Sequence, residues 1–188
     1  MDPAAGSPTD GELVARAQRG DLDAFADLVR RHEAMAVRVA SVVCGSGGAE
    51  DAAQEGFVRA YRSLHRFDTR RPFRPWLARI VANVAKNRVR SEQRHLQLAL
   101  REPGTGTAPV VAADAAIAAE RRAVLADALG RLPERDRLVL VYRWFEDMTE
   151  REIADALGVR PGTVKSRLSR AMARLRTELS DREVLARD

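Results

Sequence analysis

Residues 149–176 carry the strongest local structural signal in the sequence, a pattern typical of two helices joined by a tight turn. Thr149 and Glu152 stand three residues apart, the spacing of a capping box that starts a helix. Gly158 permits the turn, and Pro161 suits the first position of the second helix. The pattern predicts a helix-turn-helix, whose second helix can lie in the major groove of DNA.

The second predicted helix has one apolar and one basic face. Val164, Leu168, Ala171 and Leu175 recur at helical spacing and form the apolar stripe. The alternative is a plain helical hairpin with a solvated basic face. Residues 160–176 contain six basic and no acidic residues, whereas a merely solvated face normally mixes both signs, so the helix-turn-helix is favoured. The exposed face is expected to contact DNA through Arg160, Thr163, Lys165, Ser166, Arg167, Ser169, Arg170 and Arg174.

Positions along such a helix differ in what they reach. Residues in the early turns meet base edges, so we expect Lys165 and Ser166 to affect sequence preference. Arg174 lies later and is expected to reach a phosphate, whereas Arg167 and Arg170 could reach either a guanine or a phosphate.

A second basic block lies earlier in the chain. The net charge is only +5, but residues 59–95 hold 11 basic and 2 acidic residues. Two separate basic blocks are typical of two surfaces that bind a polyanion, although charge alone is equally compatible with two solvated helix faces.

The first hundred residues show helical periodicity throughout. Pro72 and Pro75 interrupt it, so residues 68–75 are expected to be non-helical. The expected helices cover residues 10–20, 21–44, 49–67 and 76–100, with a glycine-rich stop at 45–48. In the third of these, Ala53, Phe57, Ala60, Tyr61 and Leu64 are expected to face inward.

Residues 101–115 lack periodicity and are rich in proline, glycine and threonine, which is typical of a flexible linker. Beyond it, helices are expected at 117–129, 134–145, 149–156 and 161–179, with Phe145 on the apolar face. The predicted fold is all-α: two small helical domains, 1–100 and 116–188, joined by the linker, with the helix-turn-helix in the second.

Several function classes are not expected. No apolar run is long enough to cross a membrane and the N-terminus lacks signal-peptide features, so we expect a cytoplasmic protein without membrane insertion of its own. Cys44 has no partner for an internal disulfide, and the histidines are too far apart for a metal site. We find no phosphate-binding glycine loop and no catalytic constellation, so we expect no enzyme activity, no metal and no cofactor.

Two blocks of sequence resemble bacterial sigma factors. Residues 132–176 are similar to the domain that binds the promoter −35 element. Residues 49–67 and 73–90 are similar to the domain that binds core RNA polymerase and the −10 element. The order of the blocks fits, and nothing resembles the extra middle domain of housekeeping members. The chain is therefore identified as a member of the extracytoplasmic-function (ECF) subfamily.

The resemblance implies partners and roles. The expected partners are core RNA polymerase, promoter DNA and an anti-sigma factor, and the linker would thread toward the polymerase active centre. The residues expected to dock on core polymerase are Asp51, Gln54, Glu55 and Arg59. Those expected to contact the −10 element are Arg70, Arg71, Arg74, Arg79, Asn83, Lys86, Asn87, Arg88 and Arg90. Phe73 and Trp76 are expected to lie in the core rather than to stack on bases, and the paucity of aromatic residues predicts stringent promoter choice.

The main alternative is a two-domain helix-turn-helix regulator that binds duplex DNA without polymerase. It would explain residues 149–176 but not the polar docking face on the helix that begins at residue 49. Association with core polymerase would distinguish the two hypotheses.

Overall fold

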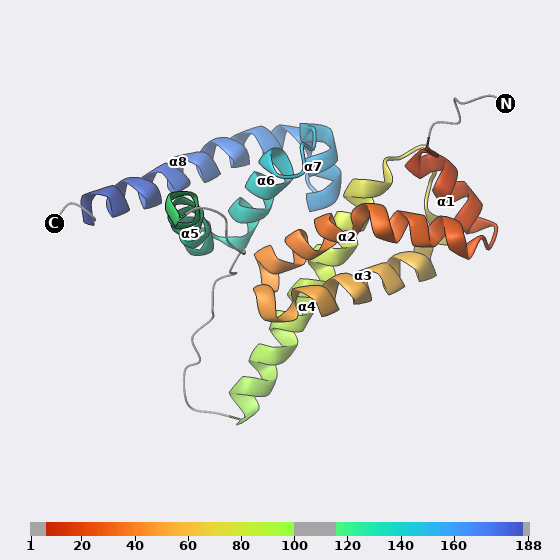
Figure 1. The fold of residues 1–188 in the computed structure, drawn as a ribbon, viewed down its shortest axis with the longest axis horizontal. Coiled ribbons are helices and arrows are strands. Elements are labelled where there is room, and N and C mark those ends of the chain that lie inside the picture. Colours follow the sequence, from red (N-terminus) through yellow and green to blue (C-terminus); the bar gives the residue numbers. More distant parts are fainter. Residues whose placement is uncertain (1–6, 100–115, 186–188) are drawn as a thin grey trace.

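The structure, a computed structural model, describes residues 7–99 and 116–185, and Figure 1 shows the chain as two groups of helices. The first group comprises α1 (Asp10–Gln18), α2 (Leu22–Cys44), α3 (Ala49–Ser63) and α4 (Phe73–Ala99), with single 3₁₀ turns at Ser46–Gly48 and Leu64–Arg66. The second comprises α5 (Ala116–Arg131), α6 (Glu134–Trp144), α7 (Glu150–Leu157) and α8 (Pro161–Leu185). The described residues include no strand, so the predicted all-α, two-domain fold is confirmed. The predicted linker, 101–115, lies outside the described residues.

In the first domain, α2, α3 and α4 pack on one another, and α1 packs on α2. The Asp21 side chain caps α2 by accepting the Ala24 N–H at 3.0 Å. Gly45 ends that helix at φ 75°, a backbone conformation that glycine adopts without strain. α2 therefore begins and ends where local sequence signals favour a helix start and a helix stop.

The expected start of α4 was wrong. The helix begins at Phe73 rather than at Trp76, so Arg74 and Pro75 are both helical. Proline is tolerated there because the first turn of a helix has no intrahelical acceptors for its N–H groups. As a result Phe73 is buried and Arg74 projects from the first turn of α4.

Two aromatic residues expected on inward faces are exposed. Tyr61 is 41% exposed, and its ring contacts the ring of Phe25, with 4.9 Å between centroids. Phe145 is 54% exposed, because α6 ends at Trp144 and the chain leaves the helical path there. The helical period was right, but the neighbouring elements do not extend over these positions.

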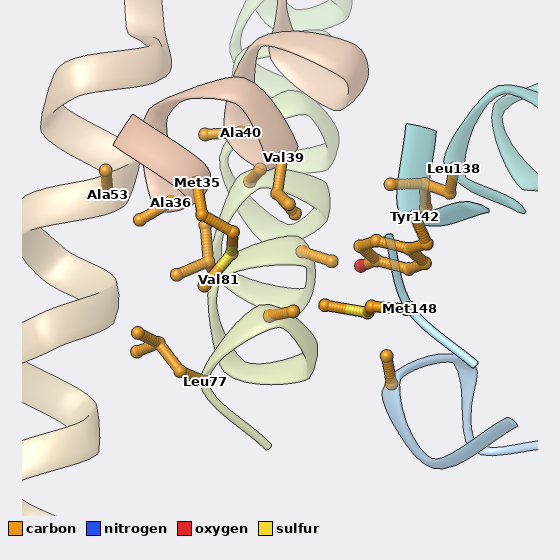
Figure 2. Packing of buried hydrophobic residues seen from close by; sticks show 14 of the residues in the cluster. Met35, Ala36, Val39, Ala40, Ala53, Leu77, Val81, Leu138, Tyr142 and Met148 are labelled. Atoms are coloured by element: carbon orange, nitrogen blue, oxygen red, sulfur yellow. The ribbon is translucent and has the colours of Figure 1, made fainter. Parts of the chain in front are cut away.

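The two domains share one hydrophobic core. Leu138, Tyr142 and Met148 of the second domain are fully buried and belong to the same cluster as Val39 and Val81 of the first. Figure 2 shows Tyr142 and Met148 pointing from the second domain toward α2 and α4. Across the contact between the domains, α2 packs against α6 and α4 packs against α7. No described helix has the length and apolarity that a membrane crossing requires.

Candidate DNA- and polymerase-binding surfaces

The helix-turn-helix is built from local interactions. The Thr149 hydroxyl oxygen accepts the Glu152 N–H at 3.3 Å, and the Glu152 carboxylate accepts the Thr149 N–H at 2.9 Å. Gly158 ends α7 at φ 66° in the left-handed region, and α8 follows from Pro161. The capping box and glycine turn predicted from the sequence are confirmed.

The two faces of α8 separate as its sequence predicts. Val164, Ala171 and Leu175 are buried, and Leu168 is half-buried. The opposite face exposes Arg160, Lys165, Ser166, Ser169 and Arg170, while Thr163 and Arg167 are half-buried. The residues expected to read bases are thus free of the core, and the polar face of α8 is available to a duplex.

Arg174 has a partner inside the protein. Its Nη1 donates to Oδ2 of Asp136, a carboxylate on α6 that is only 7% exposed. A buried carboxylate is stable only when it is paired. Arg174 therefore joins α8 to α6, a structural role that sequence reasoning did not foresee.

The predicted docking residues share the outer face of α3. Asp51, Gln54 and Arg59 are exposed and Glu55 is half-buried. The Glu55 carboxylate pairs with Arg59 at 2.5 Å, one helical turn later. Asp51 accepts a hydrogen bond from Arg88 of α4 at 3.0 Å, so a residue of the predicted docking set meets one of the predicted −10 set.

A pocket lies beside the loop between α3 and α4. Its volume is about 150 Å³, and its walls include Phe67, Trp76 and Arg71. The rings of Phe67 and Trp76 lie 4.6 Å apart between centroids. Asp68, which also lines the pocket, accepts hydrogen bonds from Nε and Nη2 of Arg70 at 2.9 and 2.8 Å. These hydrogen bonds lower the pKa of Asp68 to about 2.

The remaining −10 candidates lie along α4, except Arg71, which lies in the loop before it. Asn83, Asn87 and Arg90 are exposed. Arg71, Arg74 and Lys86 instead face carboxylates of the second domain, at Asp155, Glu146 and Glu134 respectively. Arg79 packs beside the Gly158 turn, where a Cβ would lie 3.1 Å from its Nη2. The structure thus places part of this set at the contact between the domains.

Sequence reasoning missed Arg38 and Glu146. Glu146 is 2% exposed, although it follows α6 in a short connection, and its carboxylate accepts a hydrogen bond from Arg38 Nε at 2.7 Å. The two residues are 108 positions apart, and neither belongs to a periodic pattern or motif. No sequence signal could have paired them.

Among the described residues, Cys44 is not part of a metal site. No group of three or more His, Cys, Asp and Glu side chains in the described ranges could hold a metal ion. Cys44 is half-buried at the end of α2, donates to the Ala40 carbonyl at 3.2 Å, and has its thiol pKa raised by burial. Its surroundings are those of a packing residue.

Comparisons with known proteins match both domains. Residues 28–95 match the family described as Sigma-70 region 2, and residues 122–175 match Sigma-70, region 4. The ECF RNA polymerase sigma factor SigW of Bacillus subtilis is 31% identical over 178 residues, covering 89% of this chain and 95% of SigW. The RNA polymerase sigma factor NccH of Alcaligenes xylosoxydans xylosoxydans is 33% identical over 180 residues, covering 93% of this chain and 97% of NccH.

Solved structures agree with this assignment. CnrH, solved in complex with the cytosolic domain of CnrY, superposes with a TM-score of 0.69 at 30% identity, covering 92% of this chain and 97% of CnrH. The sigma factor RpoE of Bartonella quintana, solved with the anti-sigma factor NepR, has the same fold at a TM-score of 0.68 and 21% identity, covering 83% of this chain and 96% of RpoE. With both regions matched in order and relatives aligned over nearly their full lengths, the chain belongs to the ECF RNA polymerase sigma factors.

Proposed function

We propose that this ECF sigma factor divides promoter recognition between its two domains. Residues 1–100 would dock on core RNA polymerase and read the −10 element, residues 116–188 would read the −35 element, and 101–115 would link them. The two family matches, at 28–95 and 122–175, fall within these proposed domains. The observation that carries the proposal is the exposed polar face of α8 that follows the glycine turn, on a stretch, 160–176, that contains no acidic residue.

The −35 reading rests on the geometry of α8. Lys165 and Ser166 are exposed within its first two turns, where a helix lying in the major groove presents side chains to base edges. Arg170 is exposed one turn later and would reach either a base edge or a phosphate.

The docking and −10 roles rest on α3, α4 and the loop between them. The outer face of α3 offers acidic and amide groups, which suit a basic helical partner such as a clamp of the polymerase. The pocket beside the loop combines aromatic walls with arginines, which suit an unstacked base and its backbone, and the carboxylates of Asp68 and Asp155 also line it.

The proposal extends to partners and chemistry. RpoE of Bartonella quintana was solved with an anti-sigma factor, which supports an inhibitory protein partner for this chain too. The role requires no cofactor, metal or enzymatic activity of the chain itself, and it places the protein with the polymerase in the cytoplasm.

Run-off transcription with purified core polymerase on a promoter library tests this function. We expect initiation only when the chain is added. A chain that binds duplex DNA tightly but neither associates with core polymerase nor supports initiation would be a DNA-binding regulator instead. Because base contacts contribute roughly 1–3 kcal/mol each, Lys165→Ala and Ser166→Ala should change the selected −35 sequences. If the selected −35 sequences did not change, α8 would not lie in the major groove as proposed.

Glu55→Arg tests the proposed docking face, and Asp23→Arg is its control. The control makes the same charge change at an exposed site on α2. We expect Glu55→Arg to weaken association with core polymerase at least tenfold, and Asp23→Arg to leave it within twofold. Circular dichroism should show the same helix content in both. Equal losses of affinity would show a general charge effect and exclude α3 as the docking site.

A further inference from the structure

A second pocket lies where the two domains meet, between α2, α5 and α6. Its volume is about 190 Å³. Both domains supply apolar walls to this α2–α5–α6 pocket: Val42 of α2, Leu129 of α5, Val141 of α6, and Phe145 directly after α6. None of the described residues that line it belongs to the sets assigned above to DNA or to core polymerase. The proposed function therefore gives this pocket no role.

Two arginines also line the α2–α5–α6 pocket. Arg38 borders it from α2 and Arg137 from α6. The described lining residues include no carboxylate, so the charged groups at the pocket are of one sign. Apolar walls beside cations suit a small amphipathic anion, because its tail loses contact with water while its charged group gains a partner.

Arg137 has no ion-pair partner within the described part of the chain. Its Nη1 donates to the main-chain carbonyl oxygen of Gly130 at 2.7 Å, and its Nε is buried without a hydrogen-bond acceptor there. Glu134 attracts the guanidinium without pairing with it, and the Glu134 carboxylate pairs instead with Lys86 at 3.1 Å. Burial lowers the pKa of Arg137 below its ordinary value. Since a partly buried, unpaired charge is costly, an anion beside Arg137 would be stabilised.

Arg38 supplies a second cation from the other domain. Its Nε donates to the Glu146 carboxylate at 2.7 Å, which engages one N–H group of the guanidinium and leaves others for an anion in the pocket. Because Arg38 already has this carboxylate, Arg137 is the lining cation, among the described residues, that an anion would newly pair. One negative charge is enough for that pairing, which favours a carboxylate over a doubly charged phosphate.

The volume of the pocket sets the size of the apolar tail. An apolar cavity of roughly 150 Å³ accommodates a benzene molecule. The 190 Å³ of the α2–α5–α6 pocket therefore suits a tail of about five or six carbon atoms. A planar carboxylate also matches the fork of a guanidinium, which can donate two parallel hydrogen bonds to it.

We propose that the α2–α5–α6 pocket binds a small amphipathic monocarboxylate, with its carboxylate on Arg137 and Arg38 and its tail against Leu129, Val141 and Phe145. Such a ligand contacts both domains at once and binds only the folded chain, so it stabilises that chain by mass action. The site uses no residue of the proposed promoter or polymerase surfaces, and the inference does not depend on the proposed function.

Hexanoate is the probe, and isothermal titration calorimetry with the full chain measures its binding. Hexan-1-ol keeps the tail without the charge, and acetate keeps the charge without most of the tail. We expect one saturable site for hexanoate, and binding at least tenfold weaker for each of the two analogues. Hexanoate should also raise the unfolding temperature more than either analogue does at the same concentration. Equal affinities for hexanoate and hexan-1-ol would contradict the role of the arginines.

Arg137→Gln is compared with Arg135→Gln, which removes the same charge from an exposed position two residues away on α6. We expect Arg137→Gln to weaken hexanoate binding at least tenfold and Arg135→Gln to leave it within twofold, because only Arg137 borders the pocket. Ala126→Leu enlarges a side chain of the pocket wall and keeps both arginines, so it should also weaken binding at least tenfold. Circular dichroism should show unchanged helix content in all three variants.

Three results would overturn the proposal. The first is the absence of saturable hexanoate binding to the unsubstituted chain. The second is an equal loss of affinity in Arg137→Gln and Arg135→Gln, which would show attraction by the overall positive charge. The third is unchanged binding in Ala126→Leu, which would place the ligand elsewhere. A chain that binds hexanoate as expected, but never initiates transcription with core polymerase, would keep this site and lose the proposed function.

Discussion

The close approach of α3 and α4 makes Gly56 a sensitive position. A Cβ added at Gly56 would lie 2.6 Å from Val81 Cγ2 and 3.3 Å from Val81 Cα. Carbon atoms in ordinary contact are about 3.5–4.0 Å apart, so the added methyl group overlaps its neighbour by roughly 1 Å. Val81 is fully buried and β-branched, so it cannot rotate away at low cost.

Two effects compete in Gly56→Ala. Overpacking a buried site costs about 1–3 kcal/mol, and alanine in a helix interior gains about 1 kcal/mol over glycine. We therefore expect a net destabilisation of up to about 2 kcal/mol. Gly130, on α5, has no heavy atom within 4 Å of an added Cβ. Gly130→Ala keeps only the helix-propensity gain and should stabilise the chain by up to about 1 kcal/mol.

Urea unfolding followed by circular dichroism and by tryptophan fluorescence measures both variants. Gly56→Ala combined with Val81→Ala removes the overlapping methyl groups. The double variant should then be no less stable than Val81→Ala alone, a coupling of about 1–3 kcal/mol. If the two substitutions add instead, or if Gly56→Ala stabilises as Gly130→Ala does, the close contact of α3 and α4 is not as described.

Three further predictions concern single side chains. The hydroxyl of Tyr142 is fully buried without a hydrogen-bond partner among the described residues, so Tyr142→Phe should raise the free energy of unfolding by about 1 kcal/mol in a urea titration, and a loss would show that the hydroxyl has a partner. Burial raises the pKa of the Cys44 thiol, so iodoacetamide should modify Cys44 at pH 8 at least tenfold more slowly than it modifies the urea-unfolded chain, and equal rates would refute the burial. The hydrogen bond from His32, assisted by Arg31 and opposed by partial burial, lowers the pKa of Asp10. The stability from Asp10 is therefore complete above pH 4 and is lost as the pH falls through the lowered pKa, and Asp10→Asn should flatten the decline of Tm between pH 4 and pH 2; a parallel decline in both chains would contradict this.

Local signals accounted for most of the helical architecture. Asp21, Thr149 and Gly158 begin or end helices because their side chains or backbone angles satisfy groups within a few residues. Such interactions are visible in sequence. The start of α4 was missed because Pro75 forbids only an interior position, and its tolerance in a first turn depends on where the preceding chain enters.

What the sequence could not supply was the partner of each exposed or buried position. Periodicity placed Phe145 on the apolar face of its helix. It could not show that α6 ends at Trp144 and that Phe145 stays exposed to solvent. The sequence shows that Arg74 is basic. It does not show that a buried carboxylate 72 residues away pairs with it. Contacts of this kind depend on how the domains pack. The sequence could therefore predict which residues form a functional surface, but not which of them form ion pairs within the protein.

The alternation of charge along the chain has a second meaning in the folded protein. Residues 96–159 contain 11 acidic and 8 basic residues and separate the basic blocks at 59–95 and 160–176. Read as sequence, the acidic stretch only divides two polyanion-binding surfaces. In the structure, three of its carboxylates pair with cations of the first basic block, while the basic face of α8 keeps exposed cations. A surface of one sign repels itself, so internal partners of opposite charge stabilise the first block. The same segregation of charge that predicts DNA binding therefore also supplies the carboxylates that neutralise part of the first block in the folded chain.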